Sequence, residues 1–493
     1  MNRELAPAPG GAVSSLPPRA AAVNDRERFL ARHSIRWLLI AVFLAVIALG
    51  GPDRSSVYAV PLAVVLVFSL DIKHPLALRN LFLVYSVGLF TYGNHLLFPD
   101  GSSLAPDLLL YVVAFTAGYG LFSRLWRPPV DREHGSASVP RSPVDPADPV
   151  TRRIEVVLWL LFGVEMLRVA ALIAPYGPRA FYGGQELVNR ISSYGQAGST
   201  GVEGITTIAT TVLVTAAGAL YADHCLRTGV RIKYRLLLLV ALLPPLMSLE
   251  RSTVVYGSVL LAAVYLCDRR LRPSLDPSTS KATGNSSRML VAFAILLCAV
   301  GVAVKFGDIR AKRINQQVFS RSQDVNTLEQ VLRGEFTTIV FYRDVKENID
   351  FLGYRYGRNI GGAFVTRLVP RTIWADKPIT TTEYYMRQLH PQELQAGFSL
   401  APSLFGVGLL NFGVAGTMAL IAILGTAAAY CDRGYVEGVV SRMPQFLIAA
   451  TWFYSLLRDD LSTSLASIAV TFLAFALLRR AVASVNDRAV TAA

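Results

Sequence analysis

The stretch from Gly357 to Pro378 carries four cationic side chains between short apolar runs, namely Arg358, Arg367, Arg371 and Lys377. An arginine meets phosphate oxygens through two parallel hydrogen bonds, and it does so most strongly where water is partly excluded. The apolar runs are too short to cross a bilayer, and the stretch is too basic to lie in hydrocarbon unaided. The pattern therefore predicts an interfacial or re-entrant segment that holds cations at the depth of lipid phosphates.

The residues between these cations fit the same interpretation. Gly361 and Gly362 allow the backbone to approach a ligand closely. Pro370 disfavours a helical conformation at the residue before it, so it separates Arg367 from Arg371. Trp374 is typical of side chains that anchor a segment at headgroup level. The plainer alternative is that the arginines of this stretch bind ordinary anionic headgroups.

Charged residues in other parts of the chain are predicted to lie on the same side of the membrane. Glu165 and Arg168 are three residues apart on one helix face inside an apolar segment, where an unpaired charge is costly; a structural ion pair is the simpler interpretation. Arg251 follows Glu250 in a short turn between two apolar segments, and Arg458 stands in another such turn. Because any turn on the outer side is polar, each of these charges alone is weak evidence. The stronger evidence is that all of them are predicted to lie on one side.

Three residues are candidates for a general base that takes a proton from a hydroxyl group. His390 is the only histidine of the long outer segment, and Glu383 lies seven residues before it. Asp459 in the late turn is the third candidate. A surface histidine without a function is the alternative for His390. Walker A, GxSxG, HExxH and DxD motifs are absent, so nucleotide-driven pumping and zinc proteolysis have no support.

The composition is that of a polytopic membrane protein. The chain has 493 residues, of which 53% are hydrophobic and 17% are charged, and a mean hydropathy of +0.42. The net charge of +14 lies in blocks between apolar runs. This distribution favours a role in membrane topology and in contact with anionic lipid over a role in nucleic-acid binding. The four cysteines show neither a disulfide framework nor metal-ligand spacing. We therefore expect no bound metal and no cofactor.

Apolar runs long enough for a bilayer predict an all-α fold with about twelve transmembrane helices. The expected spans are 36–50, 57–71, 80–98, 104–123, 154–174, 203–222, 234–249, 252–267, 289–306, 404–430, 445–457 and 461–478. This arrangement begins with a disordered basic tail (1–35) and nine helices (36–306), which are interrupted by linkers at 127–151 and 269–288. A large loop (307–403) follows and holds the 357–378 segment. The chain then has three helices (404–480) and a tail (481–493).

The basic residues of the short segments define one orientation. With both termini in the cytoplasm, every short basic cluster lies on the cytoplasmic side, as the positive-inside rule requires. The loop 307–403 then lies outside. It carries a net positive charge, which long translocated segments are allowed to do.

The order of motifs resembles that of Wzy-type polymerases of lipid-linked oligosaccharide repeat units, including O-antigen polymerases. The similarity lies in a Gly-rich run (357–362), Pro370-Arg371, Trp374, Lys377-Pro378, Pro402-Ser403, Asn411-Phe412-Gly413, the Arg251-Ser252 turn and the turn 457–460. It covers about a fifth of the chain. Val407 stands where the family has an acidic residue, and Asp459 replaces the glycine of the late turn.

The resemblance implies a metal-independent glycosyltransferase of the GT-C type in the bacterial inner membrane. Its donor and acceptor would be polyprenyl-diphosphate-linked oligosaccharides, and its partners the lipid bilayer, a flippase and a chain-length regulator. The cations of the 357–378 segment, with Arg168, Arg251 and Arg458, would bind the donor diphosphate and glycan. Gly361, Gly362, Pro370, Trp374, Pro378, Asn411 and Gly413 would shape the site.

Three alternatives stay open at this point. An O-antigen ligase hands a finished glycan to another lipid and differs from the polymerase only in its acceptor. A transporter or flippase without bond chemistry is favoured by Glu165 and Arg168 inside a span and by the helix breakers Pro244 and Pro245. A GT-C transferase that uses a monophosphate polyprenyl sugar would need acidic residues in a larger first outer loop than 51–56.

Overall fold

The computed structural model describes residues 74–88, 104–125, 149–174, 202–228, 230–248, 251–271, 301, 337–366, 374, 376, 378–395 and 400–491. In this part of the chain the regular structure is entirely helical, without a strand. The predicted all-α class is therefore confirmed for these residues.

In the described residues, nine helices overlap nine of the twelve predicted spans, although α3 covers only the first part of the span predicted at 80–98. They are α3 (Leu78–Val87), α5 (Ala105–Leu125), α6 (Pro149–Ile173), α8 (Val202–Thr228), α9 (Tyr234–Ser248), α10 (Arg251–Leu271), α18 (Ser403–Val436), α19 (Met443–Arg458) and α20 (Leu461–Thr491). The predicted spans 36–50, 57–71 and 289–306 lie outside the described residues, except for Gly301. α6 begins inside the predicted linker 127–151, and α20 continues through the predicted tail to Thr491.

Two of these helices are long and apolar enough to cross a membrane by length and composition, namely Ser403–Val436 and Leu461–Ser484. Shorter apolar helices lie at Leu78–Val87, Asp107–Ser123, Tyr234–Met247 and Ser252–Asp268. Large apolar side chains on the long helices also face outward; Leu167 is 72% exposed and Ile423 67%. Exposed apolar surface of this kind favours contact with lipid.

The helices α5 and α18 cross so closely that glycine is required at the contact. A Cβ atom on Gly118 would stand 2.1 Å from the carbonyl oxygen of Ala422, and one on Gly425 would stand 2.3 Å from that of Phe115. Aromatic rings fill the space beside this crossing, where Phe82 and Phe115 stack with 3.8 Å between ring centroids. The main core of the described part lies between these helices and α19.

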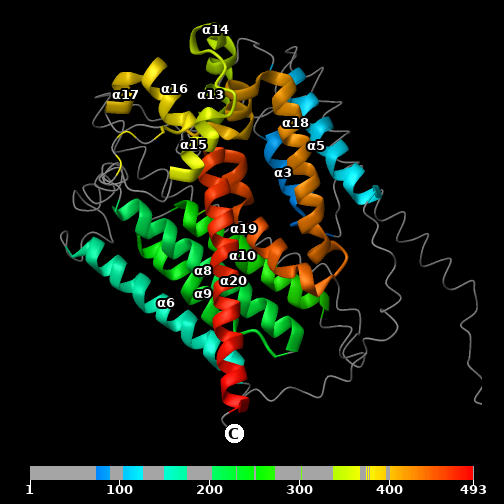
Figure 1. Ribbon diagram of the computed structural model, residues 1–493, viewed down its shortest axis with the longest axis vertical. Helices are drawn as coiled ribbons and strands as arrows, with labels where there is room; N and C mark the ends of the chain where they lie inside the picture. The colour runs from blue at the N-terminus through cyan, green and yellow to red at the C-terminus, as the bar shows by residue number, and fades with distance from the viewer. Residues whose placement is uncertain are drawn as a thin grey trace, which may run out of the picture. The chain divides into compact units, whose positions relative to one another are not determined.

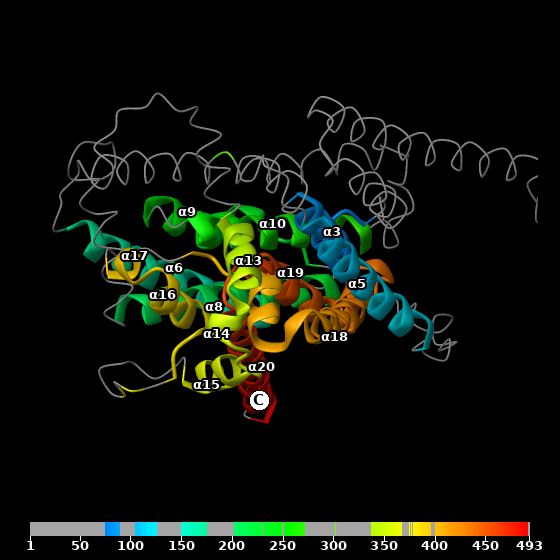
Figure 2. The same cartoon turned by 90° about the horizontal axis from the view of Figure 1, so that it is seen from above.

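Five short helices, which we call the cap, cover one end of the long helices. They are α13 (Thr337–Glu347), α14 (Ile349–Leu352), α15 (Arg358–Thr366), α16 (Thr381–Leu389) and α17 (Pro391–Gln395). Figure 1 shows the cap at the end where α18 and α20 begin, whereas α20 ends at the opposite side, and Figure 2 shows the cap helices from above. Because α13 packs on α18 and α15 packs on α20, the cap is joined to both helices.

Candidate functional site

The turn before α15 is fastened to α18 by one buried amide. The Oδ1 atom of Asn411 accepts a hydrogen bond from the backbone N–H of Gly357 at 3.2 Å, and its Nδ2 atom donates to the Val407 carbonyl at 2.8 Å. The N–H of Tyr356 donates to the Asn411 carbonyl at 2.8 Å. Asn411 is completely buried. Asn411 thereby fixes the backbone position from which the side chain of Arg358, the first residue of α15, extends.

α18 bends two residues later, at Gly413. Its backbone has φ 67° and ψ −175°, a conformation that is open almost only to glycine. The hydroxyl of Thr417 donates to the Gly413 carbonyl at 2.6 Å and supports the helix beyond the bend. The motif Asn-Phe-Gly therefore has a structural basis: the amide fastens the cap, and the glycine permits the bend beside it.

We expect Gly413→Ala to lower the free energy of unfolding by about 1–3 kcal/mol, because alanine is strained at this φ and ψ. Gly120→Ala in α5 is the matched control, since nothing lies within 4 Å of a Cβ placed there. Thermal unfolding of the two purified variants in detergent measures the difference. Equal stability of the two variants would contradict the assigned bend.

Arg358 presents an available cation at this turn. Its side chain is exposed, and in the described part of the chain it forms no ion pair. Gly361 faces open space, whereas a Cβ on Gly362 would stand 2.8 Å from the Cβ of Pro378. Trp374 is 46% exposed. The remaining predicted residues of this segment, Arg367, Pro370, Arg371 and Lys377, lie outside the described residues.

The turn between α19 and α20 is tied to the cap through Asp460. Its Oδ2 atom accepts hydrogen bonds from the backbone N–H and the hydroxyl of Thr382, at 3.1 and 3.2 Å. Its Oδ1 atom accepts from the N–H of Ser462 at 3.0 Å, which caps α20. Asp460 thus positions α16 over the start of α20.

The neighbouring residue, Asp459, points to a second group of helices. It accepts hydrogen bonds from Ser455 Oγ at 2.8 Å and from the Tyr256 hydroxyl at 3.3 Å. Arg458 Nη1 lies 3.3 Å from its other oxygen. Because its oxygens are engaged in this way, Asp459 is better suited to hold Arg458 and Tyr256 than to accept a substrate proton.

Tyr256 also lines a small cavity between α6, α8, α9 and α10. The cavity has a volume of about 20 Å³, which is room for about one water molecule. Glu165 and Arg168 line the same cavity and form an ion pair at 2.9 Å, with 7% and 14% of their side chains exposed. The predicted pair therefore exists. Arg251 begins α10, but its side chain lies outside the description.

His390 has a partner that the sequence does not indicate. Its Nε2 atom lies 2.9 Å from the Tyr385 hydroxyl and 3.4 Å from Asp344 Oδ2, and Tyr385 donates to the same carboxylate at 2.6 Å. A carboxylate in this position orients an imidazole. Glu383, in contrast, forms an ion pair with Arg387 at 2.7 Å.

A further polar contact joins the cap to α5. The hydroxyl of Tyr342 in α13 donates to Asp107 Oδ2 at 2.9 Å and lies 2.9 Å from the Tyr111 hydroxyl. Lys346 forms an ion pair with the same carboxylate at 2.5 Å. Burial raises the pKa of the Tyr342 phenol, so it remains a neutral donor. This contact holds α13 in place beside the bend of α18.

The structure brings the predicted residues together in two groups that meet at one turn. The turn that holds Arg358, Asn411 and Gly413 is connected through α16 to Asp460. Arg168 lines the same cavity as Tyr256, and both Tyr256 and Arg458 contact Asp459. The two groups therefore meet at consecutive residues. Sequence reasoning missed Asp344, Tyr385, Thr382 and Tyr256, since tyrosines and threonines are common in this chain and none stands in a recognisable motif.

The described part thus defines an all-helical protein with apolar helices suited to a membrane. None of the described residues form a group of three or more histidines, cysteines and carboxylates that could hold a metal ion. Comparison with known protein families, curated proteins and solved structures found no match to this chain.

Proposed function

We propose that this protein is a membrane glycosyltransferase that polymerises polyprenyl-diphosphate-linked oligosaccharide repeat units into a cell-envelope polysaccharide. The observation that supports this function best is the hydrogen bond between Asn411 and Gly357. It joins two segments, the Gly-rich run and Asn-Phe-Gly, that are far apart in sequence and carry the resemblance to Wzy-type polymerases. We place the reaction on the outer face of the bacterial inner membrane, with both termini in the cytoplasm.

In the proposed reaction, a hydroxyl of the acceptor repeat unit attacks the anomeric carbon of the donor glycan. The bond between this carbon and the diphosphate oxygen breaks, and the polyprenyl diphosphate leaves with the bonding electrons. Arg358, with Arg367, Arg371 and Lys377, binds the diphosphate and stabilises the charge that develops on it. Arg168, Arg251 and Arg458, on the side of the site near Tyr256 and Asp459, contact the glycan or the diphosphate.

His390 is the best-placed base for the proton of the attacking hydroxyl. Its side chain is 28% exposed, so a substrate can reach it, and its Nε2 atom lies 3.4 Å from Asp344 Oδ2. In this arrangement Nε2–H faces Tyr385 and Asp344, the other ring nitrogen, Nδ1, takes the proton, and the Asp344 carboxylate stabilises the resulting charge. Asp344 is a positioning residue, because it acts through His390.

We expect His390→Gln to reduce polymer formation about a hundredfold or more, because glutamine cannot accept the proton. Asp344→Asn should reduce the rate less, since it removes the charged partner of the imidazole but leaves the imidazole itself. Polymer length and yield from membranes, at matched protein levels, measure both effects. His224→Gln, at the opposite end of the helices, is the control. Wild-type activity of His390→Gln would remove His390 from this role.

The lipid-linked intermediates of a deletion strain test the proposed function itself. Loss of the polymerase leaves single repeat units on the polyprenyl carrier and no longer chains. Accumulation of long lipid-linked polymer would instead show an O-antigen ligase. The ion pair Glu165–Arg168 beside the cavity is the observation that favours a transporter. Accumulation of repeat units only on the cytoplasmic face of the membrane in the deletion strain would show that the protein is a transporter.

A further inference from the structure

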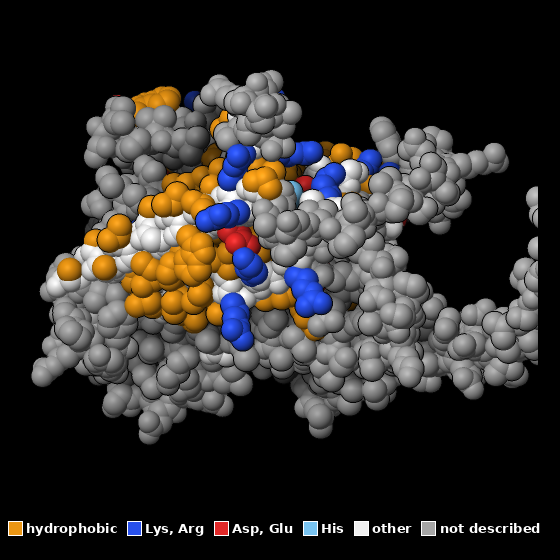
Figure 3. All heavy atoms as spheres, turned by 90° about the horizontal axis from the view of Figure 1, so that it is seen from below, with side chains coloured by type: hydrophobic (Ala, Val, Ile, Leu, Met, Phe, Trp, Pro, Cys, Tyr) orange, Lys and Arg blue, Asp and Glu red, His pale blue; other side chains and the backbone are white. Residues whose placement is uncertain are grey.

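The end of the long helices opposite the cap carries a cluster of exposed cations, which we call the basic end. Its members come from three elements, the start of α6, the segment before and into α9, and α20: Arg152, Arg231, Lys233, Arg235, Arg479 and Arg480. Figure 3 shows Lys and Arg side chains gathered on the face seen from below, next to a hydrophobic area.

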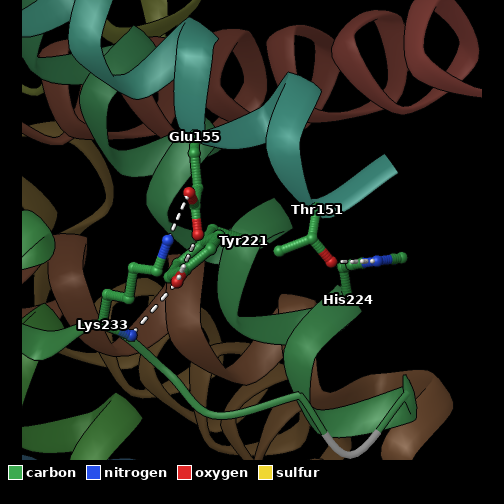
Figure 4. A network of polar contacts seen from close by, with 5 residues as sticks. All are labelled: Thr151, Glu155, Tyr221, His224 and Lys233. Carbon is green, nitrogen blue, oxygen red and sulfur yellow. Dashed lines mark hydrogen bonds and ion pairs between the residues drawn. The ribbon is translucent and has the colours of Figure 1, made fainter. Parts of the chain in front are cut away.

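A network of polar contacts fixes two of these elements to each other (Figure 4). The Nε2 atom of His224 lies 3.1 Å from Thr151 Oγ1, which joins α8 to the start of α6. Glu155 of α6 forms an ion pair with Lys233 at 2.7 Å. The Tyr221 hydroxyl donates to Glu155 at 3.4 Å and accepts from the Lys233 N–H at 3.1 Å. The positions of Arg152 and Arg231 are therefore fixed together.

The third element, α20, packs along α8. The buried carboxylate of Asp223 in α8 forms an ion pair with Arg227 at 2.8 Å. Since α20 packs along α8, the side chains of Arg479 and Arg480 belong to the same end of the helices. The cations of the basic end thus stand on a common scaffold rather than on separate loops.

The acidic side chains Glu155, Asp223 and Asp268, which lie beside these cations, already have partners. Glu155 forms an ion pair with Lys233, Asp223 forms one with Arg227, and Asp268 accepts a hydrogen bond from the Tyr234 hydroxyl. In the described part of the chain, Arg152, Arg231, Arg235 and Arg480 form no ion pair. Four guanidinium groups are therefore available to an anion from outside the chain.

An exposed apolar strip of α6 continues from Arg152 along the same helix face. It consists of Val156, Trp159, Leu160, Val164 and Leu167, each 49–72% exposed. These residues follow Arg152 at helical spacing, and the strip begins about 6 Å from it along the axis. A cation directly below an apolar strip matches a phospholipid, whose phosphate adjoins its acyl chains. A soluble acidic partner would leave the strip uncovered.

We propose that the basic end binds the headgroups of anionic phospholipids, whose acyl chains lie along the apolar strip of α6. This interaction does not depend on the proposed reaction. It would hold α6, α8 and α20 at a fixed depth and stabilise the folded state by binding it preferentially.

Thermal unfolding of the purified full chain in detergent, titrated with phosphatidylglycerol or phosphatidylcholine, tests this proposal. We expect phosphatidylglycerol to raise Tm and phosphatidylcholine to leave it unchanged, with the shift weakened at high salt. In Arg152→Gln/Arg231→Gln the phosphatidylglycerol concentration for half of the shift should rise about thirtyfold. Arg343→Gln/Arg387→Gln, which removes two cations of the cap, is the matched control and should behave as wild type.

Three results would overturn the proposal. They are an equal shift with phosphatidylcholine, an unchanged titration of the double variant, and an equal shift with soluble polyglutamate, which would show a surface for an acidic protein. If the double variant fails to fold, Arg480→Gln replaces it, and the same comparison applies.

Discussion

Polymer synthesis is expected to fall by about 10²–10³-fold when Arg358 is replaced by alanine, the usual loss when one donor to a developing anion is removed. Arg358 is exposed, forms no ion pair in the described part of the chain, and begins α15 where Asn411 fixes the backbone. Because it is not needed to satisfy a buried charge, the variant should keep its expression level and stability. The measurement is the yield of long chains from membranes at matched protein levels.

Two further variants make this result specific. Arg358→Lys keeps the charge but loses the bidentate geometry, so an intermediate activity is expected. Arg343→Ala removes an arginine of α13 that is paired with Glu347 and should retain full activity. Long chains at the wild-type level from Arg358→Ala would contradict the role of Arg358 at the diphosphate.

The second large effect is expected on stability, from Arg168→Ala. Removing this guanidinium leaves the buried carboxylate of Glu165, which is 7% exposed, without its ion-pair partner. We expect the free energy of unfolding to fall by about 3–5 kcal/mol, as it does when one member of a buried pair is lost. Denaturation of the purified variant in mixed micelles measures this value.

The double variant Glu165→Leu/Arg168→Met separates a structural role from a functional one. Replacing both charges by apolar groups should recover most of the stability. If Arg168 contacts the substrate, the recovered fold still lacks activity. Arg387→Ala, which breaks an exposed ion pair of the cap, should cost at most about 1 kcal/mol. An effect of Arg168→Ala as small as that of Arg387→Ala would contradict the buried pair.

Hydrophobic patterning predicted the helices well because each long helix carries a nearly continuous apolar run. α9 and α19 begin and end within two residues of the expected spans. The ends of α6 and α20 were less predictable. The first turn of α6 and the last turns of α20 are charged. A rule that counts only apolar residues assigns such charged turns to loops, so it predicts helices that are too short. The number of spans and the GT-C architecture stay predictions.

The candidate site was predictable only in part. The pair Glu165–Arg168 follows from local spacing, whereas Gly413 was a candidate only through the resemblance to Wzy-type polymerases. The contact between Asn411 and Gly357 joins residues more than fifty positions apart, and no spacing rule specifies such a contact. Asp344 was missed for the same reason, since only the packing of α13 against α16 brings it to His390.

The central claim, that this protein lengthens lipid-linked glycans, is tested most directly with purified protein in liposomes. The assay supplies polyprenyl-diphosphate-linked repeat units, with no ion gradient, no nucleotide sugar and no other protein. We predict a ladder of products that differ by one repeat unit, with release of polyprenyl diphosphate, and no ladder from Arg358→Ala. Repeat units that stay at the length of one, while the same folded protein moves them across the bilayer, would contradict the claim.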